Sequence, residues 1–153
     1  REVLGYPVQS VQNDLETFQR VTKLIRQHRP HIILTHRPND HHRDHRAVSL
    51  IADEARWKAW ENINPHWGEP WETKWVLHFE IFDLIEKPHI ISLFDEHCLD
   101  KKLKAMASQV SQTESFDYEE YIKGLAIARG AVGGRGCYGE AFFISNFHST
   151  IVH

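Results

Sequence analysis

The first third of the chain passes from a helical to an extended hydrophobic pattern. Asn13-x-x-Glu16 resembles a helix capping box, and the apolar residues that follow it recur at helical spacing. We expect this helix to end near Pro30, because the residue before a proline avoids the helical region. The continuous apolar run from His31 to Thr35 then predicts a short, buried parallel strand. The helical positions are Leu15, Phe18, Val21, Leu24 and Ile25.

The rest of the chain continues the alternation of helices and strands. A second helix is expected from about Asp44, followed by an irregular insertion or lid over residues 57–75, which hold all 5 tryptophans. Two further strands are expected at 74–80 and 88–94, and a last strand at 140–147. Asp95 is expected to cap a helix that runs to about Gln109, and Asp117 another that ends at the glycine-rich stretch 130–136. The pattern predicts the α/β class.

Histidines and carboxylates are concentrated directly after the first predicted strand. Residues 36–45 hold four histidines and two aspartates, and six of the 12 histidines fall between His28 and His45. Imidazole and carboxylate are ligands that zinc prefers, and they move protons near neutral pH. Because ligands of open α/β sheets bind at the carboxyl ends of strands, this position favours a functional site.

Asp44 is the expected N-cap of the second helix. His45 then lies in the first turn, where the helix dipole keeps an imidazole neutral, as metal binding requires. Asp44 or Asp40 is a candidate to hold the N–H of a neighbouring imidazole and fix its tautomer. The H-x-x-H spacing of His42 and His45 is itself a weak signal, because position 43 is arginine and the H-E-x-x-H pattern is absent. A solvated, histidine-rich polar loop explains the local sequence equally well.

The composition of the chain argues against several classes of function. The chain has 153 residues, about one domain, with a net charge of −3 and therefore no global basic footprint for nucleic acid. No apolar run approaches the roughly 20 residues that cross a bilayer, and no signal peptide opens the chain. Cys98 and Cys137 are far apart, which favours free thiols in a reducing cytosol. The start, REVLGYP, reads like the end of a strand, so an upstream segment is expected.

Three segments in order carry a resemblance to a known family. T-H-R-P-N-D-H-H-R-D-H-R-A-V, residues 35–48, is similar to the second motif of the LmbE/PIG-L N-acetylglucosamine deacetylases, a strand ending in T-H-x-P and then D-x-H-x-D-H-R at the head of a helix. The opening L-G-Y-P agrees, as do Ser111-Gln112, A-x-x-R-G (Ala126 to Gly130) and Y-G-E-A-F (Tyr138 to Phe142). The layout resembles the bacterial branch that acts on GlcNAc-malate or related small glycosides.

The chain departs from the family pattern at two places. The first family motif, P-H-P-D-D-E or A-H-P-D-D-E, which supplies a histidine and an aspartate to zinc and the general-base aspartate, is absent from these 153 residues. In the family it lies upstream of the position where this chain starts. Arg43 stands where the family usually has proline, and His41 is an extra histidine in the loop. This chain therefore holds one of the three metal ligands that the resemblance implies.

The resemblance implies roles for individual residues. His45 would be the zinc ligand, and His42 the electrophile or general acid that polarises the acetyl carbonyl or protonates the departing amine. Asp44 would orient His42 and stabilise its charge. The residues that would bind the sugar hydroxyls or an acidic aglycone are Arg37, Asp40, Arg129 and Arg135.

The resulting expectation is a single Rossmann-like, LmbE-type domain over residues 1–153, with a mostly parallel sheet whose first strand or strands are missing from this chain. It would hydrolyse the N-acetyl group of a GlcNAc-containing small molecule in the cytoplasm, using zinc or another divalent transition metal. No nucleic acid or membrane partner is expected, and a homo-oligomer is possible. Two alternatives are a catalytically inactive carbohydrate-binding or scaffolding relative and a histidine-rich metal-binding module.

Overall fold

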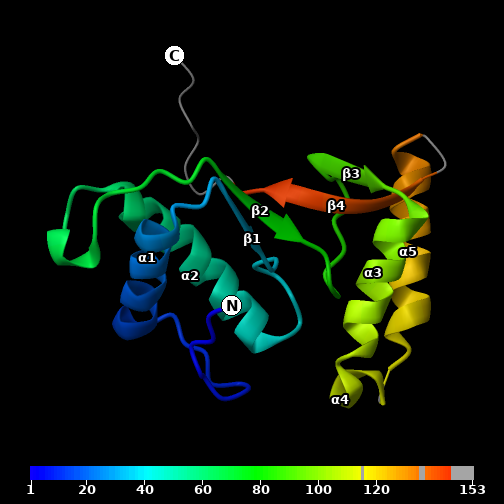
Figure 1. The fold of residues 1–153 in the computed structure, drawn as a ribbon, viewed down its shortest axis with the longest axis horizontal. Helices are drawn as coiled ribbons and strands as arrows, with labels where there is room; N and C mark the ends of the chain where they lie inside the picture. Colours follow the sequence, from blue (N-terminus) through cyan, green and yellow to red (C-terminus); the bar gives the residue numbers. More distant parts are fainter. Residues whose placement is uncertain (115, 135–136, 146–153) are drawn as a thin grey trace. The chain divides into compact units, whose positions relative to one another are not determined.

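The computed structural model describes residues 1–114, 116–134 and 137–145. The chain divides into two compact units, which we describe separately: residues 1–86 with 143–153, and residues 87–142. Helices and strands alternate through both units, which confirms the predicted α/β class (Figure 1). No helix among the described residues has the length and apolar character needed to cross a bilayer.

The first unit opens with helix α1 (Leu15–His28). Its N-cap is Asp14, whose side chain accepts a hydrogen bond from the Thr17 N–H at 2.9 Å, so the predicted cap at Asn13 is wrong by one residue. The side chain of Asn13 instead donates to Glu54 at 3.0 Å. The helix ends before Pro30 as expected, with Arg29 in the left-handed conformation at φ 51°.

Strands β1 (Ile32–Thr35) and β2 (Trp75–Phe79) pair in parallel, with Thr35 opposite His78. Parallel pairing brings the carboxyl ends of both strands to one edge, where the histidine-rich loop follows β1. The expected burial of β1 is confirmed on one face only. Thr35 is 3% exposed, whereas Ile32 and Leu34, which point to the other face, are 50% and 58% exposed.

Helix α2 (Arg43–Trp60) packs against α1 and against both strands (Figure 1). Its N-cap is His42, not Asp44: the His42 ring accepts a hydrogen bond from the Asp44 N–H at 3.2 Å. The contact with α1 is formed by Ala55 and Ala59, which are fully buried against Ile25. Because alanine side chains are small, the two helix backbones can approach closely and hold the first turn of α2 beside β1.

Arg26 organises the chain that follows α2. Its guanidinium is buried, at 2% exposed, and donates to six backbone carbonyls between Lys58 and Gly68. This segment contains the last turn of α2 and a short 3-10 helix, η1 (Pro65–Trp67). The predicted irregular insertion therefore begins after Trp60, and buried hydrogen bonds to Arg26 fix its path.

The second unit contains strand β3 (Ile90–Phe94) and most of strand β4 (Tyr138–Ile144), which pair antiparallel from Ile90 opposite Phe142 to Phe94 opposite Tyr138. The sequence did not indicate this antiparallel pairing. Residues 146 and 147, which were predicted to end the last strand, lie outside the described residues.

Three helices complete this unit: α3 (Glu96–Ala107), the short α4 (Val110–Thr113) and α5 (Tyr118–Val132). The predicted caps at Asp95 and Asp117 are confirmed, since each carboxylate accepts a hydrogen bond from a first-turn N–H, at 2.9 and 3.0 Å. Helices α3 and α5 lie side by side (Figure 1).

Two glycines let α5 and β4 touch backbone to backbone. A Cβ on Gly130 would lie 1.5 Å from the carbonyl oxygen of Cys137, and a Cβ on Gly139 would lie 2.9 Å from the backbone nitrogen of Gly130. Gly130 belongs to A-x-x-R-G and Gly139 to Y-G-E-A-F. The close backbone contact between these two glycines therefore explains why each motif has glycine at that position. Any side chain at either position would force the helix and the strand apart.

We predict that Gly130→Ala lowers the free energy of unfolding by at least about 1–3 kcal/mol, the usual scale of overpacking, because backbone atoms cannot yield as a side chain does. Gly124→Ala on the same helix is the matched control. Its Cβ would meet nothing within 4 Å, so it is expected to be neutral or stabilising by up to about 1 kcal/mol. Urea denaturation of both variants measures the difference, and equal stabilities would contradict the close contact.

Candidate active site

The histidine-rich loop after β1 is built on the carboxylate of Asp40, which is 1% exposed. One of its oxygens, Oδ1, accepts from the backbone N–H of His42 at 2.8 Å and contacts Nδ1 of His45 at 3.0 Å. The guanidinium of Arg46 holds the same loop by donating to the backbone carbonyls of Asp40 and His41, at 2.8 and 2.7 Å. The loop is thus tied to the first turn of α2 at several points.

These contacts assign opposite tautomers to His42 and His45. Because a carboxylate only accepts, Nδ1 of His45 carries the proton that bonds to Asp40, and Nε2 of the neutral ring keeps a free lone pair. Nδ1 of His42 accepts from the Asp44 N–H, so in the neutral ring the proton is on Nε2, which becomes a donor. One ring is therefore prepared to bind a cation, and the other to donate a hydrogen bond.

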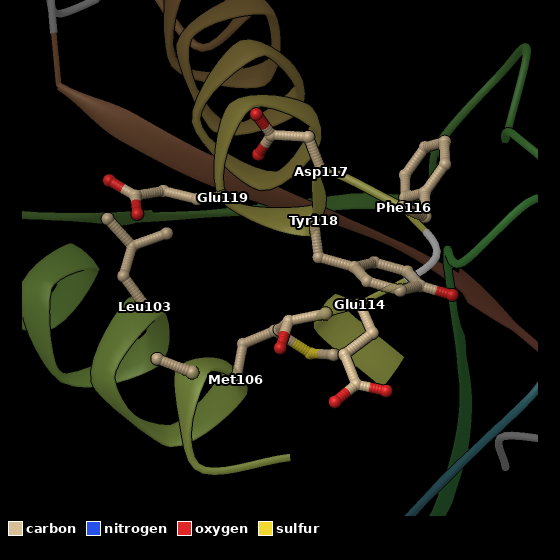
Figure 2. A pocket seen from close by; sticks show the side chains of 9 residues that line it. Leu103, Met106, Glu114, Phe116, Asp117, Tyr118 and Glu119 are labelled. Atoms are coloured by element: carbon tan, nitrogen blue, oxygen red, sulfur yellow. The ribbon is translucent and has the colours of Figure 1, made fainter. Parts of the chain in front are cut away.

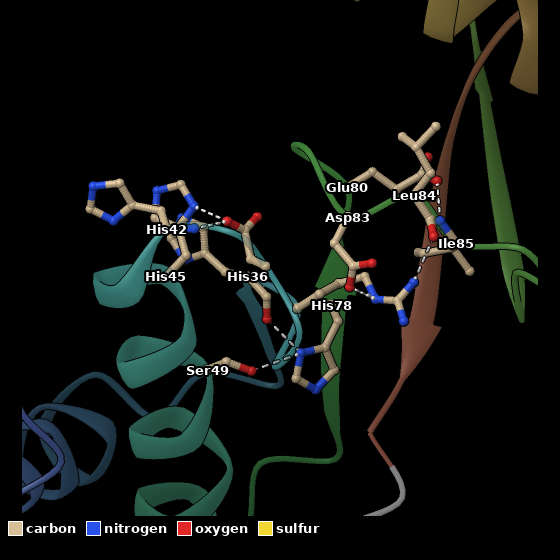
Figure 3. A network of polar contacts seen from close by, with 11 residues as sticks. His36, His42, His45, Ser49, His78, Glu80, Asp83, Leu84 and Ile85 are labelled. Atoms are coloured by element: carbon tan, nitrogen blue, oxygen red, sulfur yellow. Dashed lines mark hydrogen bonds and ion pairs between the residues drawn. The ribbon is translucent and has the colours of Figure 1, made fainter.

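The rings of three histidines gather at the N-terminus of α2 (Figure 3). His36 stacks on His45 with centroids 4.0 Å apart and an interplanar angle of 19°, and His42 lies 4.7 Å from His45. Burial, followed by the proximity of His45, lowers the pKa of His36 to about 4, and His42 also lowers it while Asp40 opposes the shift. His36 is therefore an uncharged ring that supports His45 at neutral pH.

The side chain of Asp44 takes a place that differs from the expectation. Its two carboxylate oxygens accept from the backbone N–H groups of Gln9 and Val11, at 2.6 and 3.2 Å. The carboxylate therefore does not orient His42, and the backbone N–H of Asp44 does so instead. The reason is the position of His42 as N-cap, which places the first free N–H groups of the helix next to its ring.

The side chain of Arg37 is also occupied. Its Nε lies 3.1 Å from the Asp83 carboxylate, and its Nη1 donates to the Leu84 carbonyl at 3.0 Å. Together with Glu80, which accepts from the Ile85 N–H, Arg37 holds the loop after β2 (Figure 3). Like Asp40, which was also expected to bind sugar, Arg37 has an internal role in this structure.

Two further arginines, Arg129 and Arg135, were expected to bind the sugar or its aglycone. Arg129 is half-buried in the last turn of α5, in the second unit, and Arg135 lies outside the described residues.

A cavity of about 520 Å³ lies in the second unit and involves none of the clustered histidines (Figure 2). Leu103 and Met106 line one side, and Phe116 and Tyr118 line the other. Of its carboxylates, that of Asp117 caps α5 and that of Glu119 pairs with Lys123 at 2.6 Å. Two of the three carboxylates that line the cavity are thus engaged in local contacts, and the third, Glu114, belongs to an exposed residue.

A second polar group lies beneath the histidine cluster and was missed from the sequence. His78 on β2 is 2% exposed and contacts the His36 carbonyl at 2.6 Å and Ser49 at 3.3 Å (Figure 3). Its Nε2 also lies 3.4 Å from the carboxylate of Asp53. Burial lowers the pKa of His78, but the hydrogen bonds to Asp53 and the His36 carbonyl and the charge of Asp53 together raise it above its usual range. The one sequence signal was the spacing of Ser49 and Asp53, four and eight residues after His45.

Among the described residues, no group of three or more histidine, cysteine or acidic side chains is arranged to hold a metal ion. His45 has one ring nitrogen on the buried carboxylate of Asp40, the arrangement usual behind metal-binding histidines. The described residues therefore fit a part of a metal site and not a whole one.

Comparison with known proteins found one family model and several solved structures that match this chain. Residues 1–56 match the family model described as "PIG-L: GlcNAc-PI de-N-acetylase", a range that includes the histidine cluster. No curated protein matches the chain. Nine chains of solved structures match it, and three similar structures are described below.

A conserved protein of Thermus thermophilus is 23% identical with a TM-score of 0.84, covering 92% of this chain and 63% of its own. The N,N'-diacetylchitobiose deacetylase of Pyrococcus horikoshii is 23% identical, with a TM-score of 0.77. The match covers 94% of this chain and 56% of the deacetylase. The 4-carboxy-2-hydroxymuconate hydratase of Pseudomonas putida is 20% identical with a TM-score of 0.72, covering 95% and 63%. The chain thus spans about three fifths of the length of these structures, and they establish its fold.

We predict that Asp40→Ala lowers the free energy of unfolding by about 1–3 kcal/mol, because it leaves the His42 N–H without its buried acceptor. Asn39→Ala, at the adjacent exposed position, is the control and should change stability by less than about 0.5 kcal/mol. Chemical denaturation with chelator present measures both. A loss at Asn39 as large as that at Asp40 would show that the carboxylate does not organise the loop.

Proposed function

We propose that this chain belongs to a zinc-dependent N-deacetylase that removes the acetyl group from an N-acetylglucosamine-containing small molecule. The observation that carries the proposal is the pair of opposite tautomers at His42 and His45. Two names support the chemistry: the family model over residues 1–56 is that of a de-N-acetylase, and one similar structure is a chitobiose deacetylase. A hydratase shares the fold, so the histidine pair, and not the fold, is the argument.

In this proposal, Nε2 of His45 is one protein ligand of the zinc ion, and Asp40 fixes the ring through Nδ1. Further ligands are needed, since catalytic zinc sites usually use three protein ligands. The resemblance assigns them to the P-H-P-D-D-E motif. Zinc bound there supplies a Lewis acid and a water of lowered pKa.

His42 acts on the acetyl group itself. Its Nε2–H is positioned by the Asp44 N–H behind the ring, and it donates a hydrogen bond to the carbonyl oxygen as negative charge develops there. The contact to Nδ1 requires that this nitrogen be unprotonated, which favours the electrophilic role over the general-acid role. His42 lies beside His45, with ring centroids 4.7 Å apart, so one acetyl group can be near both rings.

The sugar or its aglycone would be held by arginine side chains. Arg129 and Arg135 are proposed from the resemblance alone. Arg37 would have to leave Asp83 to bind a substrate directly.

We predict that His42→Ala lowers turnover by about 10²–10⁴-fold, the scale of a group that acts in proton transfer or charge stabilisation, and leaves zinc content nearly unchanged. His41→Ala is the matched control, because the His41 side chain is exposed, and should retain activity. Acetate release from a GlcNAc glycoside, beside metal analysis, measures both variants. Equal losses from the two variants would contradict the assignment of His42.

We predict that His45→Ala loses both zinc and deacetylation, because it removes a metal ligand. Asp44→Asn should retain zinc, since it leaves the proposed ligand His45 in place. The backbone N–H that supports His42 is also still present. Metal content after dialysis against a weak chelator, measured beside amine release, compares the two. Retention of zinc by His45→Ala with loss of zinc from Asp44→Asn would reverse the proposed roles.

A further inference from the structure

Helix α2 presents a polar stripe to the two strands. His45, Ser49 and Asp53 are spaced by four residues and therefore lie along one face of the helix. His45 contacts the ring of His36, whereas Ser49 and Asp53 contact His78 deeper in the unit. The same helix face thus carries a residue of the proposed active site and the two partners of a buried histidine.

The ring of His78 lies between two acceptors. Nδ1 is 2.6 Å from the His36 carbonyl, and Nε2 is 3.4 Å from Oδ2 of Asp53. Since a carbonyl and a carboxylate both accept, only a ring with protons on both nitrogens satisfies the two contacts. A neutral ring would turn a lone pair toward one of the two oxygens.

The surroundings of Asp53 support the same state. Asp53 is 9% exposed, and its other oxygen, Oδ1, is buried without a hydrogen-bond partner among the described residues. A buried carboxylate needs a compensating charge, and the facing His78 ring supplies it. Other groups that the described residues place near the ring include the Ser49 hydroxyl, the uncharged ring of Phe143 at 6.4 Å, and Arg37, whose positive charge opposes protonation.

We propose that His78 is a positioning residue for the histidine cluster: it donates one N–H to Asp53 on α2 and the other to the His36 carbonyl at the end of β1, and so fixes the distance between helix and strand. This inference rests on the proposed function for its catalytic consequence only. Asp53 lies about two helical turns from His45, so a shift at Asp53 moves the whole first turn of this rigid helix. The position of His45 relative to His36 then depends on a contact that touches neither ring.

The first test is independent of catalysis. In the ¹⁵N-histidine-labelled chain, both ring nitrogens of His78 should carry protons at pH 6.5, and the ring should titrate above its ordinary value of 6.5. Asp53→Asn should lower this midpoint below that of the wild type, because it removes an opposite charge. Glu54→Gln, which removes the neighbouring carboxylate on the same helix, should leave it unchanged. A neutral, single-tautomer His78 at pH 6 would overturn the proposal.

Stability should follow the same ionisation. Because the folded pKa is raised, the stabilisation from His78 is fully present below pH 6.5 and is lost as the pH rises through the folded value. The melting temperature of the wild type should therefore fall more steeply over that pH range than the melting temperature of His78→Gln, whose side chain cannot ionise. Parallel curves for the two proteins would count against the charged pair.

The catalytic test compares Asp53→Asn with Glu54→Gln in the zinc-loaded enzyme. We expect kcat of Asp53→Asn to fall by about 10–100-fold at neutral pH, the scale of a small misplacement, with KM little changed and Glu54→Gln near wild type. The loss of kcat in Asp53→Asn should become smaller at lower pH, where His78 of the variant is protonated. Simple destabilisation of the fold would not give this pH dependence. An active wild type matched by Asp53→Asn at every pH would overturn the proposal. A wild type without deacetylase activity would refute the proposed function, and the NMR and unfolding measurements would still decide on His78.

Discussion

The burial of the Asp40 carboxylate is the constraint on which the histidine cluster depends. A carboxylate that is removed from water must be surrounded by donors, and this one has the His42 N–H and the His45 ring as its partners. Meeting that requirement fixes the path of the loop, the start of α2 and the tautomer of His45 together. The same residue that looks like a polar loop position in the sequence is therefore the internal support of the site.

Two histidines of the first unit have pKa values that are shifted in opposite directions. Burial lowers the pKa of His36, and its neighbours His45 and His42 reinforce the shift. Burial has the same effect on His78, but Asp53 and a main-chain carbonyl overcome it. The result is an uncharged ring stacked at the proposed active site and a charged ring beneath it. Charge is thus kept away from a place where a cation would bind and is used where two elements must be held together.

The sequence predicts the elements better than their contacts. Periodicity and capping aspartates located α3 and α5, because both signals are local, and Asp95 and Asp117 act as predicted. The cap of α2 was misplaced, because a histidine is an unusual N-cap and Asp44 a common one. The role of His78 could not be read from the sequence, since it arises only when β1 and β2 pair and place it opposite Thr35. Likewise, the resemblance named His42 and His45, but their tautomers follow from hydrogen bonds formed in the folded chain.

Arg26 has a consequence for how this protein can change over evolutionary time. Its guanidinium holds the segment after α2 through carbonyl oxygens, which every amino acid possesses. Exposed side chains of that segment can therefore be exchanged without loss of its path, provided that Arg26, the buried Ala59 and Trp67, and Gly68 with its φ of 101° are kept. A single residue on α1 thus makes the surface between α2 and β2 tolerant of substitution, so this stretch can acquire new side chains while the histidine cluster keeps its geometry.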